Sequence, residues 1–166
     1  MMGRIVFSLG TVLGIGCMSD ATDSGVAAKH PCEPGAGPSA ILGVGELAYE
    51  SVEDSGGMAE LIHGPQGGYH INMALQAEYL DASAPWFVHL IGEIDGEVVG
   101  ETKPYATMRC NQSVPALQAW ALLLIWDAEP EDLHGKTAAV TAELEDASGT
   151  TLNLSADVVI YDPYLE

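Results

Sequence analysis

The chain has 166 residues, of which 24 are acidic and five are basic, and its formal net charge is −19 at pH 7. An acidic surface repels nucleic-acid phosphates and anionic lipid headgroups, so we expect no nucleic-acid partner and no basic membrane-binding patch. The length suits one folded domain with a single hydrophobic core.

The first 16 residues have the three-part layout of an export signal. Arg4 supplies the positive charge, residues 5–15 form an apolar stretch, and the small residue Gly16 precedes Cys17. The apolar stretch is too short for a permanent membrane span, which takes about 20 residues. An ordinary secretory signal that leaves Cys17 as a spare thiol would also fit this pattern.

Residues 14–17, Gly-Ile-Gly-Cys, resemble the lipobox of bacterial lipoproteins. In that family the cysteine is acylated on sulfur, and the signal peptide before it is removed. The resemblance implies that residues 1–16 are the signal peptide and that Cys17 carries acyl (palmitate) chains, worth about 0.8 kcal/mol of anchoring per buried CH₂. Because Met18 and not Asp follows the cysteine, it also implies an exported protein anchored in the cell envelope, at the outer membrane.

Three cysteines are an odd number for an exported protein. Lipidation of Cys17 leaves Cys32 and Cys110 as a pair, in a compartment where disulfides persist. A bridge between them would close a long loop and would stabilise the fold by roughly 4 to 5 kcal/mol in the chain-entropy description. We therefore predict a Cys32–Cys110 disulfide.

The remainder divides at about residue 45. Residues 17–44 are dominated by Gly, Pro, Ser and Ala, which predicts a lipidated N-terminus and flexible tether. From residue 45 apolar and polar residues begin to alternate with period two, the pattern of a β-strand. The folded domain is therefore predicted to span 45–166.

Four regions of the domain carry strand signals. Residues 69–79 alternate, and residues 87–102 alternate around Asp95-Gly96, a pair typical of a two-residue hairpin turn. Residues 117–126 are apolar on both faces, which favours a central strand, with a buried helix as the alternative. Residues 137–145 and 151–161 predict a second hairpin, whose inner face carries Val140, Ala142, Leu144 and the alternate apolar residues from Leu152 to Ile160.

These segments predict an all-β fold with no convincing helix. Seven or eight short strands separated by turn signals are typical of an immunoglobulin-like antiparallel β-sandwich. The spacing of cysteines and tryptophan found in antibody domains is not evident, so the likeness is one of architecture.

The most distinctive segment is a glycine-rich loop that leads into the 69–79 strand. Pro65 sets one backbone angle there, and glycines allow positive φ. With the adjoining segments, the loop resembles uncharacterised acidic lipoproteins of Gram-negative bacteria, which implies fold class and location but no activity. As a candidate binding loop it comprises Gly64, Pro65, Gln66, Gly67, Gly68 and Tyr69, followed by His70.

Two metal sites are possible from composition. His63, His70 and His89 offer imidazole ligands for copper or zinc, although His70 can equally be a polar outward residue. The acidic stretch of Asp127, Glu129, Glu131 and Asp132 offers oxygen ligands for calcium, with a solvated loop as the default interpretation. The tryptophans at 86, 120 and 126 could form a binding patch, but core positions are the more ordinary role. Trp120 and Trp126 alternate with Leu123 and Ile125, so one of these two faces of the 117–126 segment could be partly exposed.

No nucleophile elbow, zinc-protease motif or phosphate-binding loop is present in the sequence. We therefore expect no enzyme and no cofactor. The leading hypothesis is a membrane-anchored lipoprotein whose domain binds an envelope protein or a glycan, or serves a structural role in the envelope. The alternative is a periplasmic metal-binding lipoprotein.

Overall fold

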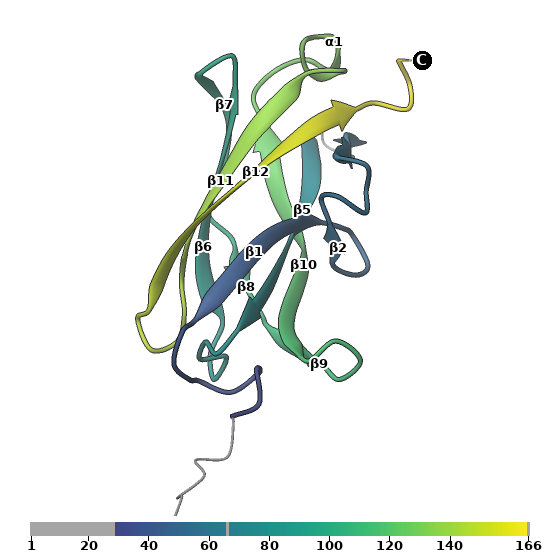
Figure 1. The fold of residues 1–166 in the computed structure, drawn as a ribbon. Coiled ribbons are helices and arrows are strands. Elements are labelled where there is room, and N and C mark those ends of the chain that lie inside the picture. The colour runs from purple at the N-terminus through teal and green to yellow at the C-terminus, as the bar shows by residue number, and fades with distance from the viewer. Residues whose placement is uncertain (1–28, 66, 166) are drawn as a thin grey trace, which may run out of the picture.

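The computed structural model describes residues 29–65 and 67–165. The expected signal peptide, Cys17 and Gln66 lie outside these residues. The described chain is nearly all β, which confirms the all-β prediction (Figure 1). Its elements are β1 (Ser39–Val44), β2 (Glu50–Ser51), β3 (Met58–Glu60), β4 (Ile62–His63), β5 (Tyr69–Glu78), β6 (Trp86–Ile94), β7 (Glu97–Thr102), β8 (Tyr105–Ala106), β9 (Arg109–Asn111), β10 (Ala116–Trp126), α1 (Pro130–Leu133), β11 (Thr137–Glu145) and β12 (Thr151–Tyr161).

The strand count differs from the prediction of seven or eight. The described residues form twelve strands, of which seven have at least six residues: β1, β5, β6, β7, β10, β11 and β12. The other five have two or three residues, too few to leave a period-two pattern in the sequence. Pro130 opens the single turn of α1, where its missing N–H costs nothing. None of the described residues belongs to a helix long and apolar enough to cross a membrane.

One hydrogen-bonded sheet contains all the described strands. Nine of them follow the order β2-β1-β5-β10-β7-β6-β11-β12-β3, and the short strands β4, β8 and β9 pair with β5, β6 and β10 respectively. The segment 58–63 joins the two sides of this sheet, because β3 pairs with β12 and β4 pairs with β5. Between them Leu61, fully buried, donates its N–H to the Tyr161 carbonyl at 2.7 Å. The sheet therefore wraps around one hydrophobic core, to which nearly every strand contributes.

The hairpin of β11 and β12 matches the predicted residue ranges at both strands. Val140, Ala142 and Leu144 are buried, while the residues between them are exposed. Asp95 and Gly96 both have positive φ in the turn between β6 and β7, as the two-residue hairpin turn requires. These two predictions are confirmed because alternation and turn chemistry are local properties of the chain.

The N-terminal side differs from the prediction. The segment 39–44, expected within the tether, forms β1 and pairs along its full length with β5, so the sheet begins before residue 45. The Cys32–Cys110 disulfide is confirmed, and it fastens the chain just before β1 to β9. The glycine- and proline-rich composition of residues 17–44 gave no strand signal for β1, and its partner β5 is distant in the sequence.

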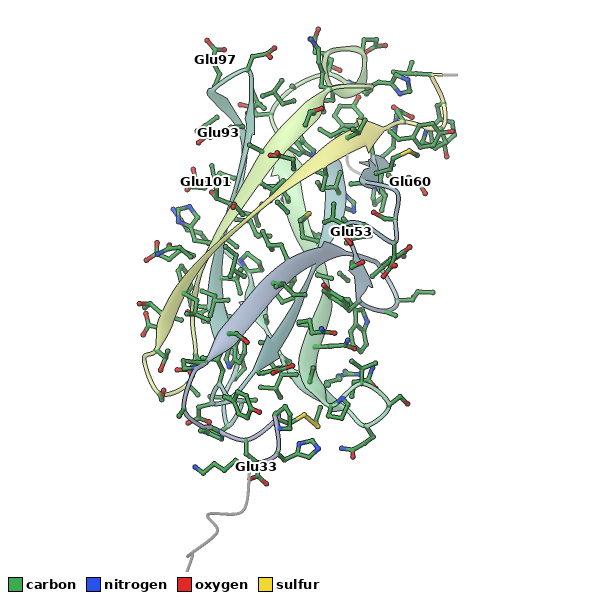
Figure 2. The ribbon with its side chains drawn as sticks, in the orientation of Figure 1. Glu33, Glu53, Glu60, Glu93, Glu97 and Glu101 are labelled. Atoms are coloured by element: carbon green, nitrogen blue, oxygen red, sulfur yellow. A yellow bond between two sulfur atoms is a disulfide. The ribbon has the colours of Figure 1, made fainter. Side chains whose placement is uncertain are left out.

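Glutamates lie on several sides of the molecule (Figure 2). The six that are labelled come from β3, β6, β7 and two connecting segments, and they point away from the core. The negative charge is therefore not confined to one patch in this view.

Candidate functional site

Strand β10 contains a bulge that changes which of its residues face the core. Ala119 pairs with Leu75 and Leu122 pairs with Met73, so β10 has one more residue than β5 between these pairs. Ala121 lies in this bulge with φ +57°, and its N–H donates to the Gly45 carbonyl at 2.9 Å. An extra residue shifts the alternation by one position, so the residues after the bulge point the opposite way.

This shift turns apolar side chains to the outside. Leu122, Leu124 and Trp126 are buried, whereas Leu123 and Ile125 are 39% and 48% exposed. The prediction that the strand is buried on both faces holds only before the bulge, at residues 116–119, and is wrong after it.

An apolar groove runs along this outer part of β10. Arg109, the one charged residue among those that line the groove, lies over the Trp120 ring at 5.6 Å from its centroid. Such a contact holds the indole in place beside the groove while leaving part of the ring accessible. The side chains that shape its walls are Thr102, Pro104, Tyr105, Trp120, Leu123 and Ile125.

One edge of β10 lacks a strand partner along the groove. On the side away from β5, β10 pairs with β9 at residues 116–118 and with β7 only at Trp126 opposite Gly100. Between these pairings, none of the described strands pairs with residues 119–125 on that side; the Ile125 N–H donates instead to the Thr102 hydroxyl at 3.1 Å. An open strand edge is a template for another extended chain.

The two ends of the groove carry opposite charges. Arg109 lies at the end where β10 begins, opposite Gln118. Glu101 and Asp127 line the adjoining pocket at the other end, next to Ile125. Because Lys103 lies 2.7 Å from the Glu101 carboxylate and balances its charge, the net negative charge at this end comes from Asp127. A peptide lying along β10 would therefore meet a positive charge at one end and a negative charge at the other.

A second polar cluster lies where β4 meets the end of β12. His63 Nε2 is 2.8 Å from Oδ2 of Asp162, a fully buried carboxylate, and its ring contacts Tyr69 and Tyr164 edge to face. The other oxygen of Asp162 accepts the Tyr164 N–H at 2.9 Å. Burial alone would raise the pKa of Asp162, but these hydrogen bonds and the nearby histidines lower it overall. The cluster fastens the C-terminal residues to the segment that closes the sheet.

The predicted binding loop lies beside this cluster. The Gly64 N–H donates to the Gly68 carbonyl at 2.7 Å and Gly67 has φ +81°, as expected of a tight turn, whereas Gly68 does not adopt positive φ. Pro65 is exposed. Tyr69 opens β5, and its hydroxyl lies 3.4 Å from the Glu129 carboxylate.

The three histidines of the metal hypothesis are separated. His63 contacts Asp162, His70 is half-buried on β5, and His89 on β6 lies 2.8 Å from Glu101. Partial burial lowers the pKa of His70, and bonds to Lys103 and His89 lower that of Glu101. In the described chain, no group of three candidate metal ligands contains any of these histidines, nor Asp127, Glu129, Glu131 or Asp132.

The tryptophans divide between core and groove. Trp86 is fully buried and donates its indole N–H to the Asp81 carbonyl at 2.6 Å. Trp126 packs against Gly92 and Gly100, where a larger residue would collide with its ring. Of the three, Trp120 alone lines the groove. Sequence reasoning pointed to Trp120, Leu123 and Ile125 but missed the groove's residues outside β10, such as Tyr105 and Arg109. The one available signal was that residues 117–126 are apolar on both faces, although a strand needs only one apolar face to pack against a core.

No comparison with known proteins identifies a family for this chain. No protein-family model matches it, and searches of curated proteins and of solved structures found no match. The functional inference therefore rests on the groove, its open edge and the charges at its ends.

Proposed function

We propose that this chain is an exported, lipid-anchored lipoprotein whose domain binds an extended segment of another envelope protein along β10. The observation that carries the proposal is the unpaired edge at residues 119–125 beside an apolar groove. An added strand would gain main-chain hydrogen bonds from the edge and side-chain contacts from the groove. Binding of this kind needs no catalytic group and no cofactor.

The charges favour one direction of the added strand. In an antiparallel arrangement the peptide's N-terminal end lies near Glu101 and Asp127, and its C-terminal end lies near Arg109. A basic residue at the first end and an acidic one at the second are then both paired. The net charge of −19 further favours a basic segment of the partner at long range.

We further propose that the fold is an immunoglobulin-like sandwich. Support comes from the seven longer strands around one core and from the two antiparallel hairpins, β6–β7 and β11–β12. The loops of such a fold cluster at its two ends. The proposed site lies elsewhere, along a strand edge, as strand addition requires.

The binding proposal is tested with a synthetic heptapeptide, Lys-Val-Thr-Val-Thr-Val-Glu with capped termini. In extended form, at about 3.4 Å per residue, it spans the same length of strand as residues 119–125. Calorimetric titration of the folded domain should show binding, and the charge-reversed peptide Glu-Val-Thr-Val-Thr-Val-Lys should bind more weakly. Absence of binding by both peptides would reject the proposal.

A matched pair of variants locates the contact. Ile125→Ser removes an apolar side chain from the groove, and Ile41→Ser removes one of similar exposure from β1. We expect Ile125→Ser to weaken heptapeptide binding about tenfold and Ile41→Ser to leave it unchanged. Equal affinities for the two variants would place the peptide away from β10.

The lipid anchor needs a separate test in cells. Metabolic labelling with an alkyne fatty acid should label the protein, and Cys17→Ala should abolish the label. Unlabelled wild-type protein would show that Cys17 is not acylated, without affecting the peptide-binding result.

A further inference from the structure

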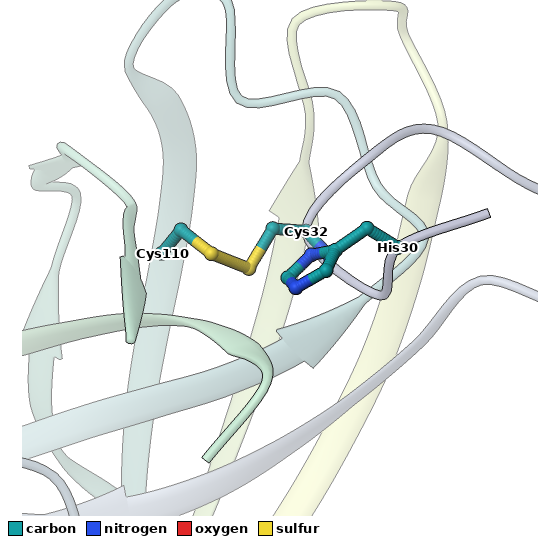
Figure 3. Close-up of side chains that lie close together, drawn as sticks. All are labelled: His30, Cys32 and Cys110. Carbon is teal, nitrogen blue, oxygen red and sulfur yellow. A yellow bond between two sulfur atoms is a disulfide. The ribbon is translucent and has the colours of Figure 1, made fainter. Parts of the chain in front are cut away.

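We infer that reduction of the Cys32–Cys110 disulfide creates a zinc site formed by Cys32, Cys110 and His30. Figure 3 shows the imidazole of His30 beside the disulfide. The ligand atoms of the three side chains all lie within 4.8 Å of one another. Two of these atoms are the bonded sulfurs, so they can act as metal ligands only after the disulfide is reduced, and the independent observation is the imidazole of His30 beside them.

The spacing suits a tetrahedral ion. Zinc binds thiolate sulfur at about 2.3 Å and imidazole nitrogen at about 2.0 Å, so ligand atoms around one ion are separated by roughly 3.5 to 3.8 Å. The Cα atoms of Cys32 and Cys110 are 5.7 Å apart, so once the disulfide is broken the two sulfurs can take up that separation by side-chain rotation.

The reducing step needs a dithiol reductant. Two electrons and two protons from the dithiol convert the disulfide to two thiols, and the dithiol becomes a disulfide. Zinc binding then releases the two thiol protons, because thiolates are the ligands. Cys110 is exposed and Cys32 is half-buried, so the bond is accessible to a reductant.

His30 must give up one contact to bind the ion. Its Nδ1 accepts the Cys32 N–H at 3.2 Å, a long hydrogen bond between exposed groups. Ligation through Nδ1 uses the same lone pair, and ligation through Nε2 moves the ring proton to Nδ1. Either way this contact is lost, and the stronger metal bond replaces it. An open fourth position for water follows from the three protein ligands.

The consequence is a cross-link that survives a change in redox conditions. In the oxidised protein the disulfide joins the segment before β1 to β9. In the reduced protein zinc would join the same two positions. The N-terminal segment would thus stay fastened to the sheet in both states, next to Arg109 at one end of the groove.

The test uses the full-length chain with Cys17→Ser, so that this thiol contributes nothing. Zinc affinity is measured by competition with a chromophoric chelator, for the dithiol-reduced and the oxidised protein. One zinc ion should bind per reduced chain, and the affinity of oxidised protein should be at least a hundredfold lower. His30→Ala should weaken binding to the reduced form about tenfold and leave the oxidised form unchanged.

Three results would overturn the inference. These are failure of the reduced protein to bind zinc, equal binding by both redox states, and an unchanged affinity in His30→Ala. Circular dichroism provides the control for folding: if reduction unfolds the domain, added zinc must restore its β-sheet signal, and failure to restore it also overturns the inference.

Discussion

Strands β10 and β11 both alternate buried and exposed residues, yet their edges and outer faces differ. From Ala139 to Glu145, β11 has a strand partner on each side, β6 and β12. Residues 119–125 of β10 pair with β5 alone, and Leu123 and Ile125 are exposed on its outer face. On β11 the exposed positions between the buried ones carry Ala139, Thr141 and Glu143. The outer positions of the strand that is paired on both sides thus carry small or polar residues, and those beside the open edge of β10 include two large apolar ones.

The difference between the two strands shows that one extra residue in a strand is enough to turn apolar side chains toward the outside. The bulge at Trp120 and Ala121 shifts the alternation of β10, and no such shift occurs in β11. The edge of β12 is also largely unpaired, but β1 lies against it. Among these strands, β10 therefore combines an accessible edge with an apolar groove.

The largest expected difference in stability is between variants of buried and of exposed leucines. Leu124→Ala in β10 and Leu144→Ala in β11 each empty a fully buried position, and each should lower the free energy of unfolding by about 2 to 5 kcal/mol. Leu123→Ala, one residue along β10, should cost less than about 1 kcal/mol. Urea unfolding measures all three. A large loss for Leu123→Ala would show that its side chain is buried and that the bulge is misplaced.

Glycine substitutions probe the single pairing that joins β10 to β7. A Cβ on Gly100 would lie 2.7 Å from the Trp126 ring and 3.0 Å from the Ile125 carbonyl oxygen, whereas one on Gly68 would meet open space. Gly100→Ala should therefore cost about 1 to 3 kcal/mol of stability, and Gly68→Ala almost nothing. Thermal unfolding distinguishes them, and equal melting temperatures would contradict the close packing of Trp126.

The turn between β11 and β12 gives a pH-dependent test. Burial would raise the pKa of Asp146, but bonds from the N–H groups of Asp81, Ser148 and Thr150 and from the Ser148 hydroxyl lower it overall. A lowered folded-state pKa stabilises the protein above the unfolded value of about 3.9 and ceases to do so as pH falls through the folded value.

Asp146→Asn should accordingly lose about 1 to 3 kcal/mol near pH 7, and the loss should shrink as the pH approaches 3. The exposed Asp157 on β12 serves as control, and Asp157→Asn should change stability little. Denaturant unfolding at several pH values gives the comparison. A loss independent of pH would mean that the charge of Asp146 has no role.

The smallest expected change in stability comes from replacing alanine with glycine, and it has opposite signs in β10 and β11. Ala121→Gly in the bulge relieves a positive φ, so it should stabilise the protein by about 0.5 to 1 kcal/mol. Ala139→Gly, at an exposed position within β11, should destabilise it by a similar amount. Paired denaturation curves reveal the signs, and destabilisation by Ala121→Gly would contradict the left-handed conformation at the bulge.

Local signals made several features of this structure predictable. Alternation gave the bounds of β11 and β12, the Asp95-Gly96 pair gave a turn, and the odd cysteine count gave the disulfide. Apart from the disulfide, pairing between distant segments was not predictable. Strand β1 sits in a glycine- and proline-rich stretch, and β3 and β4 are too short to show a period.

The candidate site was predicted least well. Nothing in the apolar run from Leu117 to Trp126 marks the bulge, because an apolar residue is compatible with either face. The position of Arg109 over Trp120 depends on the pairing of β9 with β10, which the sequence does not reveal. The histidines at 63, 70 and 89 share a chemistry but not a location, so residue type alone was a poor guide to the site.

Amide hydrogen exchange at β10 tests the central claim most directly. In the free protein, amides within 119–125 that face away from β5 should exchange faster than those of 139–145 in β11, since they lack a strand partner. Saturation with Lys-Val-Thr-Val-Thr-Val-Glu should slow exchange within 119–125 and leave 139–145 unchanged. Unchanged exchange within 119–125 at saturating peptide, or protection confined to another strand, would contradict binding at the open edge.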